Sequence, residues 1–119
     1  MIISVIGLGY IGLPTAAILA SRGFNVIGVD VNQSTVDIIN QGKIHIIEPE
    51  LDTLVNKVVK DNFLKSVTKP VEADIFIIAV PSPLKDNYQP DLSYIKSASK
   101  AIASVLARGN LVILESTSP

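Results

Sequence analysis

The sequence contains no cysteine and only one histidine, His45. Without a thiol the chain can form no disulfide, no thiolate metal site and no cysteine nucleophile of its own. A single imidazole, flanked here by isoleucines, is too few for a zinc site. We therefore expect no metal in this part of the protein and a structural or surface role for His45.

Blocks of like charge and long apolar runs are also missing. Ten basic and eleven acidic residues give a net charge of −1 and are dispersed along the chain, which argues against nucleic acid as the main partner. No apolar run reaches the roughly 18 residues of a membrane span, so no membrane partner is expected. The amino terminus lacks the basic region and cleavage site of a signal peptide, which favours a cytoplasmic protein.

What the chain does contain is the composition of one well-packed α/β domain. It has 119 residues, of which 48% are hydrophobic and 18% are charged, and this is enough for a core of its own. It stops just after an apolar run, with Glu115 to Pro119 at the place where ligands bind in open α/β sheets. We expect residues 1–119 to be one domain, an amino-terminal fragment of a longer enzyme.

The most informative feature is a glycine-rich turn between an apolar run and a helical pattern. Ile2–Ile6 has the pattern of a buried strand, and Gly7, Gly9 and Gly12 follow it as G-x-G-x-x-G. In a dinucleotide-binding fingerprint the first glycine permits the turn and the second lets the backbone approach a pyrophosphate. The third lets the helix lie near the strand. The free N–H groups and positive dipole end of that helix then face the phosphates.

The acidic residue that completes this fingerprint is Asp30. It ends a second apolar run, Val26–Val29, and lies 18 residues after Gly12. A carboxylate there accepts hydrogen bonds from the adenosine ribose, and its charge repels the 2′-phosphate of NADP. The sequence therefore predicts an NAD site. The alternative is a strand–turn–helix of small residues with no ligand, which the combination of strand, helix and acid disfavours.

Strands and helices alternate along the chain. Apolar runs predict strands over Ile2–Ile6, Asn25–Val29, Phe63–Thr68, Asp74–Val80 and Leu111–Leu114. Helical patterns cover residues 11–22, 33–40, 50–61 and 92–107, and the last should point five apolar side chains inward: Leu92, Ile95, Ile102, Val105 and Leu106. This alternation predicts an α/β fold, a Rossmann-type doubly wound parallel sheet with helices on both faces.

Candidate functional residues follow the carboxyl ends of these strands. Ser82 follows the fourth strand and Thr117 the fifth. Both hydroxyls could reach the pyrophosphate, ribose or nicotinamide end of a dinucleotide, although serine and threonine are also ordinary turn residues. Tyr10 and Ile11 lie inside the glycine turn, where their N–H groups could contact the cofactor or serve the fold alone. Glu48 is expected to be a solvated acid, and no catalytic acid–base pair is visible.

Four motifs in order resemble the UDP-glucose/GDP-mannose dehydrogenase family: Gly7–Pro14, Glu48–Pro49, Val80–Pro83 and Glu115–Pro119. The similarity runs along the whole chain, and the four together are specific where the glycine turn alone is weak. The resemblance implies an NAD-dependent, four-electron oxidation of a nucleotide sugar, such as a UDP-sugar, at C6. It also implies a cysteine that captures the aldehyde as a thiohemiacetal before a second NAD completes the oxidation to the carboxylate.

Position by position, the resemblance implies roles for residues of this chain. Tyr10–Ile11 fall in the cofactor turn, and Asp30 is the ribose acid. Ser82 stands where the family usually has threonine, and Thr117 matches the threonine near the nicotinamide and the reacting centre. One departure is Thr35, where many relatives carry a basic residue. One expected contact to phosphate or ribose therefore lacks its usual side chain.

The family's cysteine, its lysine and asparagine helpers, its sugar-binding domain and its dimer-forming helix lie in later segments. The resemblance thus implies a homodimeric enzyme, of which residues 1–119 hold NAD but cannot turn over alone. Two alternatives differ in chemistry. The sugar could be UDP-glucose or GDP-mannose, or the chain could be a non-catalytic NAD sensor, such as the regulatory domain of an ion channel. Val80–Pro83 and Glu115–Pro119 argue against the sensor, which does not need them.

Overall fold

The computed structural model describes residues 1–81, 87, 89 and 91–115. Its elements, in chain order, are β1 Ile2–Ile6, α1 Gly12–Ser21, β2 Asn25–Val29, α2 Gln33–Asn40, α3 Leu51–Lys60, β3 Leu64–Val67, β4 Ile75–Ile78, α4 Ser93–Ala103 and β5 Leu111–Leu114. The strands form one five-stranded sheet in the order β3-β2-β1-β4-β5, and every neighbouring pair is parallel. The expected doubly wound Rossmann-type sheet is confirmed.

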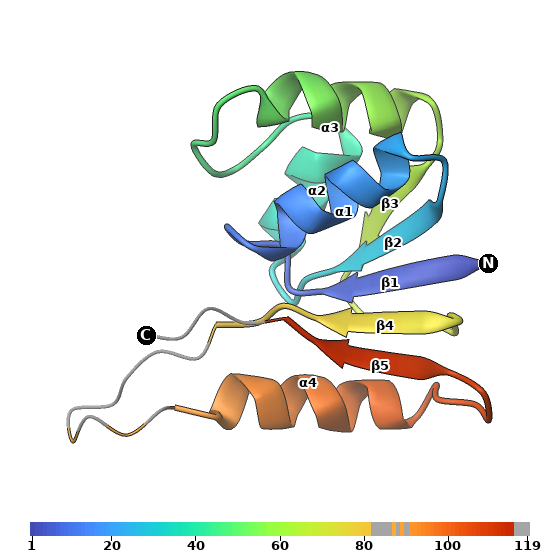
Figure 1. The fold of residues 1–119 in the computed structure, drawn as a ribbon. Coiled ribbons are helices and arrows are strands. Elements are labelled where there is room, and N and C mark those ends of the chain that lie inside the picture. Colours follow the sequence, from blue (N-terminus) through green and yellow to red (C-terminus); the bar gives the residue numbers. More distant parts are fainter. Residues whose placement is uncertain (82–86, 88, 90, 116–119) are drawn as a thin grey trace.

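Helices cover the sheet on both faces. Helices α1, α2 and α3 lie on one face and α4 lies on the other (Figure 1). Alternate side chains of a strand point to opposite faces, and the two apolar clusters follow that division. Ile3 and Val5 of β1 pack in the larger cluster with residues of α1 and α3, whereas Ile6 packs in the smaller one with Phe76 of β4 and Ile102 of α4.

Helices α1 and α3 show how the sequence pattern places side chains against the sheet. In α1, Ala16 and Ala17 are fully buried, and their small side chains let the helix axis lie close to the sheet. In α3, the spacing of the apolar residues predicts a stripe on one face, and the structure confirms that all five pack in the core: Leu51, Leu54, Val55, Val58 and Val59. Leu51, Val55 and Val58 are buried, because residues three and four apart share one face of a helix.

Helix α4 corrects two predictions. It ends at Ala103 rather than Ala107. The α-helical hydrogen bonds give way there to a 3₁₀-type bond, in which the N–H of Val105 donates to the carbonyl of Ile102, three residues back, at 2.9 Å. Leu92 precedes the helix and Leu106 follows it, so helical periodicity does not direct either side chain. Instead of pointing inward they are 46% and 43% exposed.

The two edges of the sheet differ. At the β3 edge, the side chain of Asn40 bonds both the N–H and the carbonyl of Ser66, at 2.8 and 2.9 Å, so part of that edge is already satisfied. At the other edge, the four apolar side chains of β5, Leu111–Leu114, are 41–54% exposed. Parallel strands are usually covered on both faces. The described part of the chain therefore covers the side chains of β5 only by about half.

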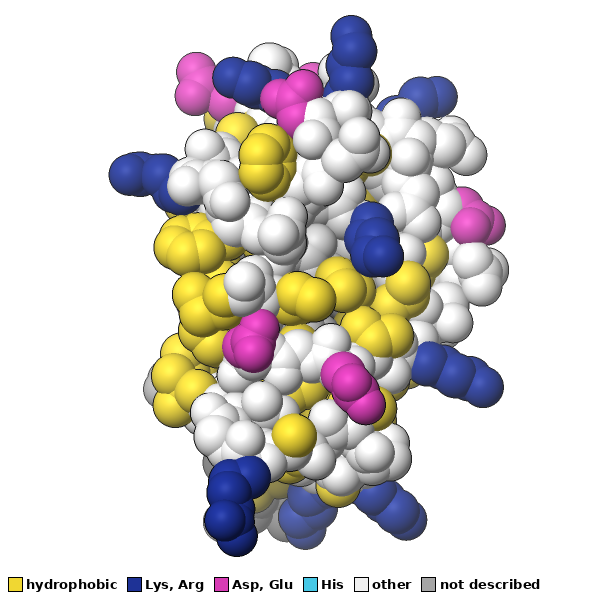
Figure 2. All heavy atoms as spheres, turned by 90° about the vertical axis from the view of Figure 1, so that its right-hand side faces the viewer, with side chains coloured by type: hydrophobic (Ala, Val, Ile, Leu, Met, Phe, Trp, Pro, Cys, Tyr) yellow, Lys and Arg dark blue, Asp and Glu magenta, His cyan; other side chains and the backbone are white. Residues whose placement is uncertain are grey.

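The face that looks onto the amino ends of the strands carries scattered charge. Lysine and arginine side chains lie mostly around its rim, and apolar side chains gather in a band across its middle (Figure 2). No continuous basic patch forms on this face. Within the described residues, no helix has the length and apolar content that crossing a bilayer requires.

Candidate functional site

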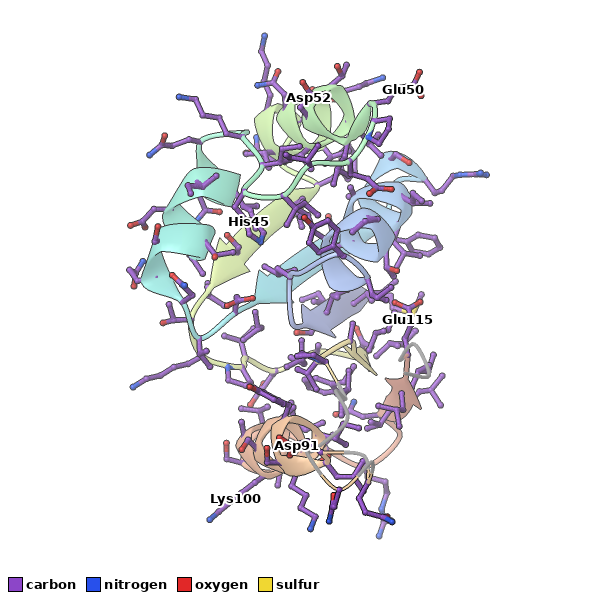
Figure 3. The ribbon with its side chains drawn as sticks, turned by 90° about the vertical axis from the view of Figure 1, so that its left-hand side faces the viewer. His45, Glu50, Asp52, Asp91, Lys100 and Glu115 are labelled. Atoms are coloured by element: carbon purple, nitrogen blue, oxygen red, sulfur yellow. The ribbon has the colours of Figure 1, made fainter. Side chains whose placement is uncertain are left out.

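A cavity of about 740 Å³ lies beyond the carboxyl ends of β1, β2 and β4. Its floor is the glycine turn, and one wall is formed by residues that follow β2 and β3, among them Asp30, Thr68 and Pro70. The opposite wall comes from the end of β4 and from α4. Figure 3 looks onto this edge of the sheet, which is where ligands bind in open α/β folds.

The three glycines of the turn serve different purposes in the structure. Gly7 has a φ of +96°, and an added Cβ would lie 2.8 Å from the carbonyl oxygen of Ala79. A Cβ on Gly12 would lie only 1.6 Å from the carbonyl oxygen of Gly7. These two positions therefore allow the turn and the close approach of α1, as predicted. A Cβ on Gly9, in contrast, would meet no atom within 4 Å.

The start of α1 lies at the turn, where Pro14 carries no N–H and the N–H of Leu13 donates to the carbonyl of Gly9 at 3.1 Å. Ile11 occupies the N-cap position, and its side chain has no oxygen that could accept from the N–H groups of the first turn. The positive end of the helix dipole favours an anion at this place. Tyr10 and Ile11 both line the cavity, and the Tyr10 side chain is 63% exposed.

Asp30 is held in a fixed orientation beside the turn. One of its carboxylate oxygens accepts from the N–H of Leu8 and the other from the N–H of Asn32, each at 3.0 Å. Each oxygen keeps a further lone pair for an incoming hydroxyl. A carboxylate that is already oriented loses little freedom when a ligand binds, which suits the ribose role predicted for it.

The wall from α4 was not predicted. Tyr94, Ser97, Ala98 and Ala101 of this helix line the cavity. They recur at spacings of three and four, so they share one face, and three of them are small. In the sequence, the available signal was a tyrosine followed at helical spacing by three small residues.

Several other candidates fall elsewhere. Ser82 and Thr117 lie outside the described residues. His45 and Glu48 are not among the residues that line the cavity. Thr35, the departure from the family pattern, is 8% exposed, and its N–H donates at 3.3 Å to the side chain of Asn32, which caps α2. Within the described residues, no three potential metal ligands lie together.

Comparison with known proteins agrees with this geometry. Residues 1–119 match the model of the UDP-glucose/GDP-mannose dehydrogenase family, NAD binding domain. Over 98% of its length the chain is 70% identical to a UDP-N-acetyl-D-mannosamine dehydrogenase of Campylobacter jejuni. It is 65% identical to an NDP-N-acetyl-D-galactosaminuronic acid dehydrogenase of Ralstonia nicotianae. The chain covers 29% and 28% of these relatives. Three segments of this chain resemble UDP-N-acetyl-D-mannosamine dehydrogenase in particular: Gly28–Gln33, Ile44–Pro49 and Ile113–Pro119.

Solved structures give the same result. The UDP-N-acetyl-mannosamine dehydrogenase of Staphylococcus aureus superposes with a TM-score of 0.95 at 43% identity, over 98% of this chain and 29% of that one. A GDP-mannose dehydrogenase from Pseudomonas aeruginosa superposes with a TM-score of 0.93 at 36% identity, over 99% of this chain and 29% of that one.

Proposed function

The chain belongs to the UDP-glucose/GDP-mannose dehydrogenase family, and from that premise we propose that it is the NAD-binding part of a nucleotide-sugar 6-dehydrogenase that oxidises UDP-N-acetyl-D-mannosamine to the uronate. NAD is the cofactor of this family's domain. The choice of sugar is carried by one observation, the 70% identity to a relative with that substrate in its name. Among the solved structures, the identity to the UDP-N-acetyl-mannosamine dehydrogenase of Staphylococcus aureus is 43%, against 36% and 32% for the GDP-mannose and UDP-glucose dehydrogenases.

The cavity fits a dinucleotide. In the proposed mode the pyrophosphate lies over Gly9 at the start of α1, where there is open space and where the N–H groups of Tyr10 and Ile11 are near. The adenosine ribose binds Asp30, whose carboxylate is already oriented by two backbone donors. Ser82 and Thr117 are assigned to the pyrophosphate–ribose and nicotinamide ends from the family pattern, and Thr117 is the proposed catalytic residue of this chain.

When bound, NAD supplies a hydride acceptor. Oxidising the C6 alcohol to the carboxylate removes four electrons, so two NAD are consumed and one water is added. The aldehyde formed first would be captured by a cysteine thiol as a thiohemiacetal. Loss of the second hydride would leave a thioester, and the added water would hydrolyse it to the carboxylate and release the thiol. This chain has no cysteine, so the thiol must come from the remainder of a longer protein. We therefore propose that residues 1–119 alone are inactive and that the intact protein is a cytoplasmic homodimer.

The experiment supplies the intact parent protein with NAD and with UDP-N-acetyl-D-mannosamine, UDP-glucose or GDP-mannose in separate reactions. NADH is counted by absorbance, and the product is identified by mass spectrometry. The proposal expects two NADH for each UDP-N-acetyl-D-mannosamine and the corresponding uronic acid. One NADH per sugar, or preferential turnover of another sugar, would contradict it. Binding of NAD without turnover of any of the three sugars would favour the alternative function, a non-catalytic NAD sensor.

Replacing Asp30 tests the ribose assignment. Asp30→Ala should weaken NAD binding to this chain by about 1–3 kcal/mol, the range for hydrogen bonds to a charged group. Isothermal titration calorimetry measures the change. Asp37→Ala is the matched control, because Asp37 is an exposed aspartate on α2 and does not line the cavity. Unchanged NAD affinity in Asp30→Ala would show that Asp30 is not the ribose ligand.

A further inference from the structure

A hydrogen bond outside the cavity joins the cofactor helix to the far end of the sheet. The hydroxyl of Thr15, in α1, donates to a carboxylate oxygen of Glu115 at 2.7 Å, across 100 residues of sequence. Glu115 directly follows β5, which is separated from β1 by β4 in the sheet. Figure 3 shows Glu115 between α1 and the end of β5. Neither residue lines the cavity.

The glycine turn explains how these distant residues meet. A Cβ on Gly12 would lie 3.3 Å from the side chain of Ala79, just after β4, so the start of α1 passes close to β4. Thr15 lies three residues after Gly12 and shares its face of the helix. That face reaches across β4, and the Thr15 hydroxyl meets the carboxylate of Glu115.

Glu115 is thereby held from two directions. Its N–H donates to the carbonyl of Ile78 at 2.8 Å, which continues the ladder between β4 and β5 by one residue. Its side chain accepts from Thr15, and a hydrogen bond to an ionised group is stronger than a neutral one. Because the side chains of β5 are about half exposed, packing alone holds the end of the strand less firmly than a fully buried strand, and these two bonds help to fix it.

We propose that Thr15 and Glu115 are a positioning pair, which fixes the end of β5 relative to the turn that holds the cofactor phosphates. This proposal rests on the proposed function. Ser116 and Thr117 follow Glu115 directly in the sequence, so a shift of Glu115 is passed to the residue assigned to the reacting centre. Hydride transfer is sensitive to such a shift, since a misplacement of about 1 Å can cost on the order of a hundredfold in rate.

The test uses the intact parent protein and Thr15→Val, which removes the hydroxyl and keeps the branched shape. We expect kcat for nucleotide-sugar oxidation to fall about tenfold or more. The dissociation constant for NAD should stay within about twofold, because the pair lies outside the cavity. Thr15→Ser, which keeps the donor, should restore most of the lost rate. Thr53→Val is the matched control, since Thr53 is an exposed threonine on α3, and its kcat should match the wild type.

A double-mutant cycle separates positioning from general stability. Glu115→Ala should lower kcat as Thr15→Val does, and the double variant should be no slower than the slower single variant, because both remove one interaction. A wild-type kcat in Thr15→Val, equal losses in Thr15→Ser and Thr15→Val, or additive losses would each overturn the pair. If the wild-type parent oxidises no nucleotide sugar, the proposed function fails and this proposal fails with it.

Discussion

Gly9→Val is expected to abolish NAD binding while leaving the fold intact. Gly9 is not among the glycines with positive φ, and a Cβ there meets no atom within 4 Å. The valine side chain would therefore fill the open space above the turn, where the pyrophosphate must approach the backbone. The expected loss is more than about a hundredfold in affinity, or about 3 kcal/mol. The free energy of unfolding should change by no more than about 0.5 kcal/mol, as for other surface substitutions.

Calorimetry and chemical denaturation on the same sample test both parts of this prediction. Gly9→Ala, with its smaller side chain, should have an intermediate affinity. Ser34→Val is a control for adding an apolar branched side chain at an exposed position away from the cavity, and NAD should bind it as it binds the wild type. If Gly9→Val still bound NAD with wild-type affinity, the phosphates would not lie on this turn.

Gly12→Ala is expected to have the opposite outcome, loss of the fold. The added Cβ would lie 1.6 Å from the carbonyl oxygen of Gly7, a backbone atom that cannot turn aside as a flexible side chain can. Helix α1 would have to move off the sheet, away from the cluster that holds Ala16 and Ala17. We expect the free energy of unfolding to fall by more than about 3 kcal/mol, the upper range for overpacking.

Urea denaturation of Gly12→Ala beside Gly9→Ala gives a matched comparison, since the same methyl group is added three residues apart. Only the variant at position 12 should show a large fall in the denaturation midpoint. Equal midpoints would mean that α1 does not lie as close to β1 and β4 as the structure places it.

Local patterns predicted most of the fold. The bounds of β1, β2, α2 and β5 agree with the prediction to the residue, because apolar runs and turn residues mark them directly. The direction of Leu92 and Leu106 was predicted wrongly, since both lie just outside the helix whose period was extended to them. Local periodicity does not show at which residue a helix begins, or where its last turn changes to a hydrogen bond between residues three apart.

The candidate site likewise has features that the local sequence predicts and features that depend on contacts between distant residues. The roles of Gly7 and Gly12 in the turn could be predicted from the motif, and the structure confirms them. The two backbone donors that orient Asp30 could not, because the orientation depends on how the turn folds back beside β2. The bond between Thr15 and Glu115 was equally hidden, since only the order of the strands in space brings these residues together.

One measurement tests the central claim most directly, that this cavity holds NAD with its ribose on Asp30. Isothermal titration calorimetry of the chain with NAD and then with NADP, in the same buffer, compares the two affinities. The account predicts that NAD binds and that NADP binds at least about tenfold more weakly, because the Asp30 carboxylate repels a 2′-phosphate. Equal or tighter binding of NADP would contradict it.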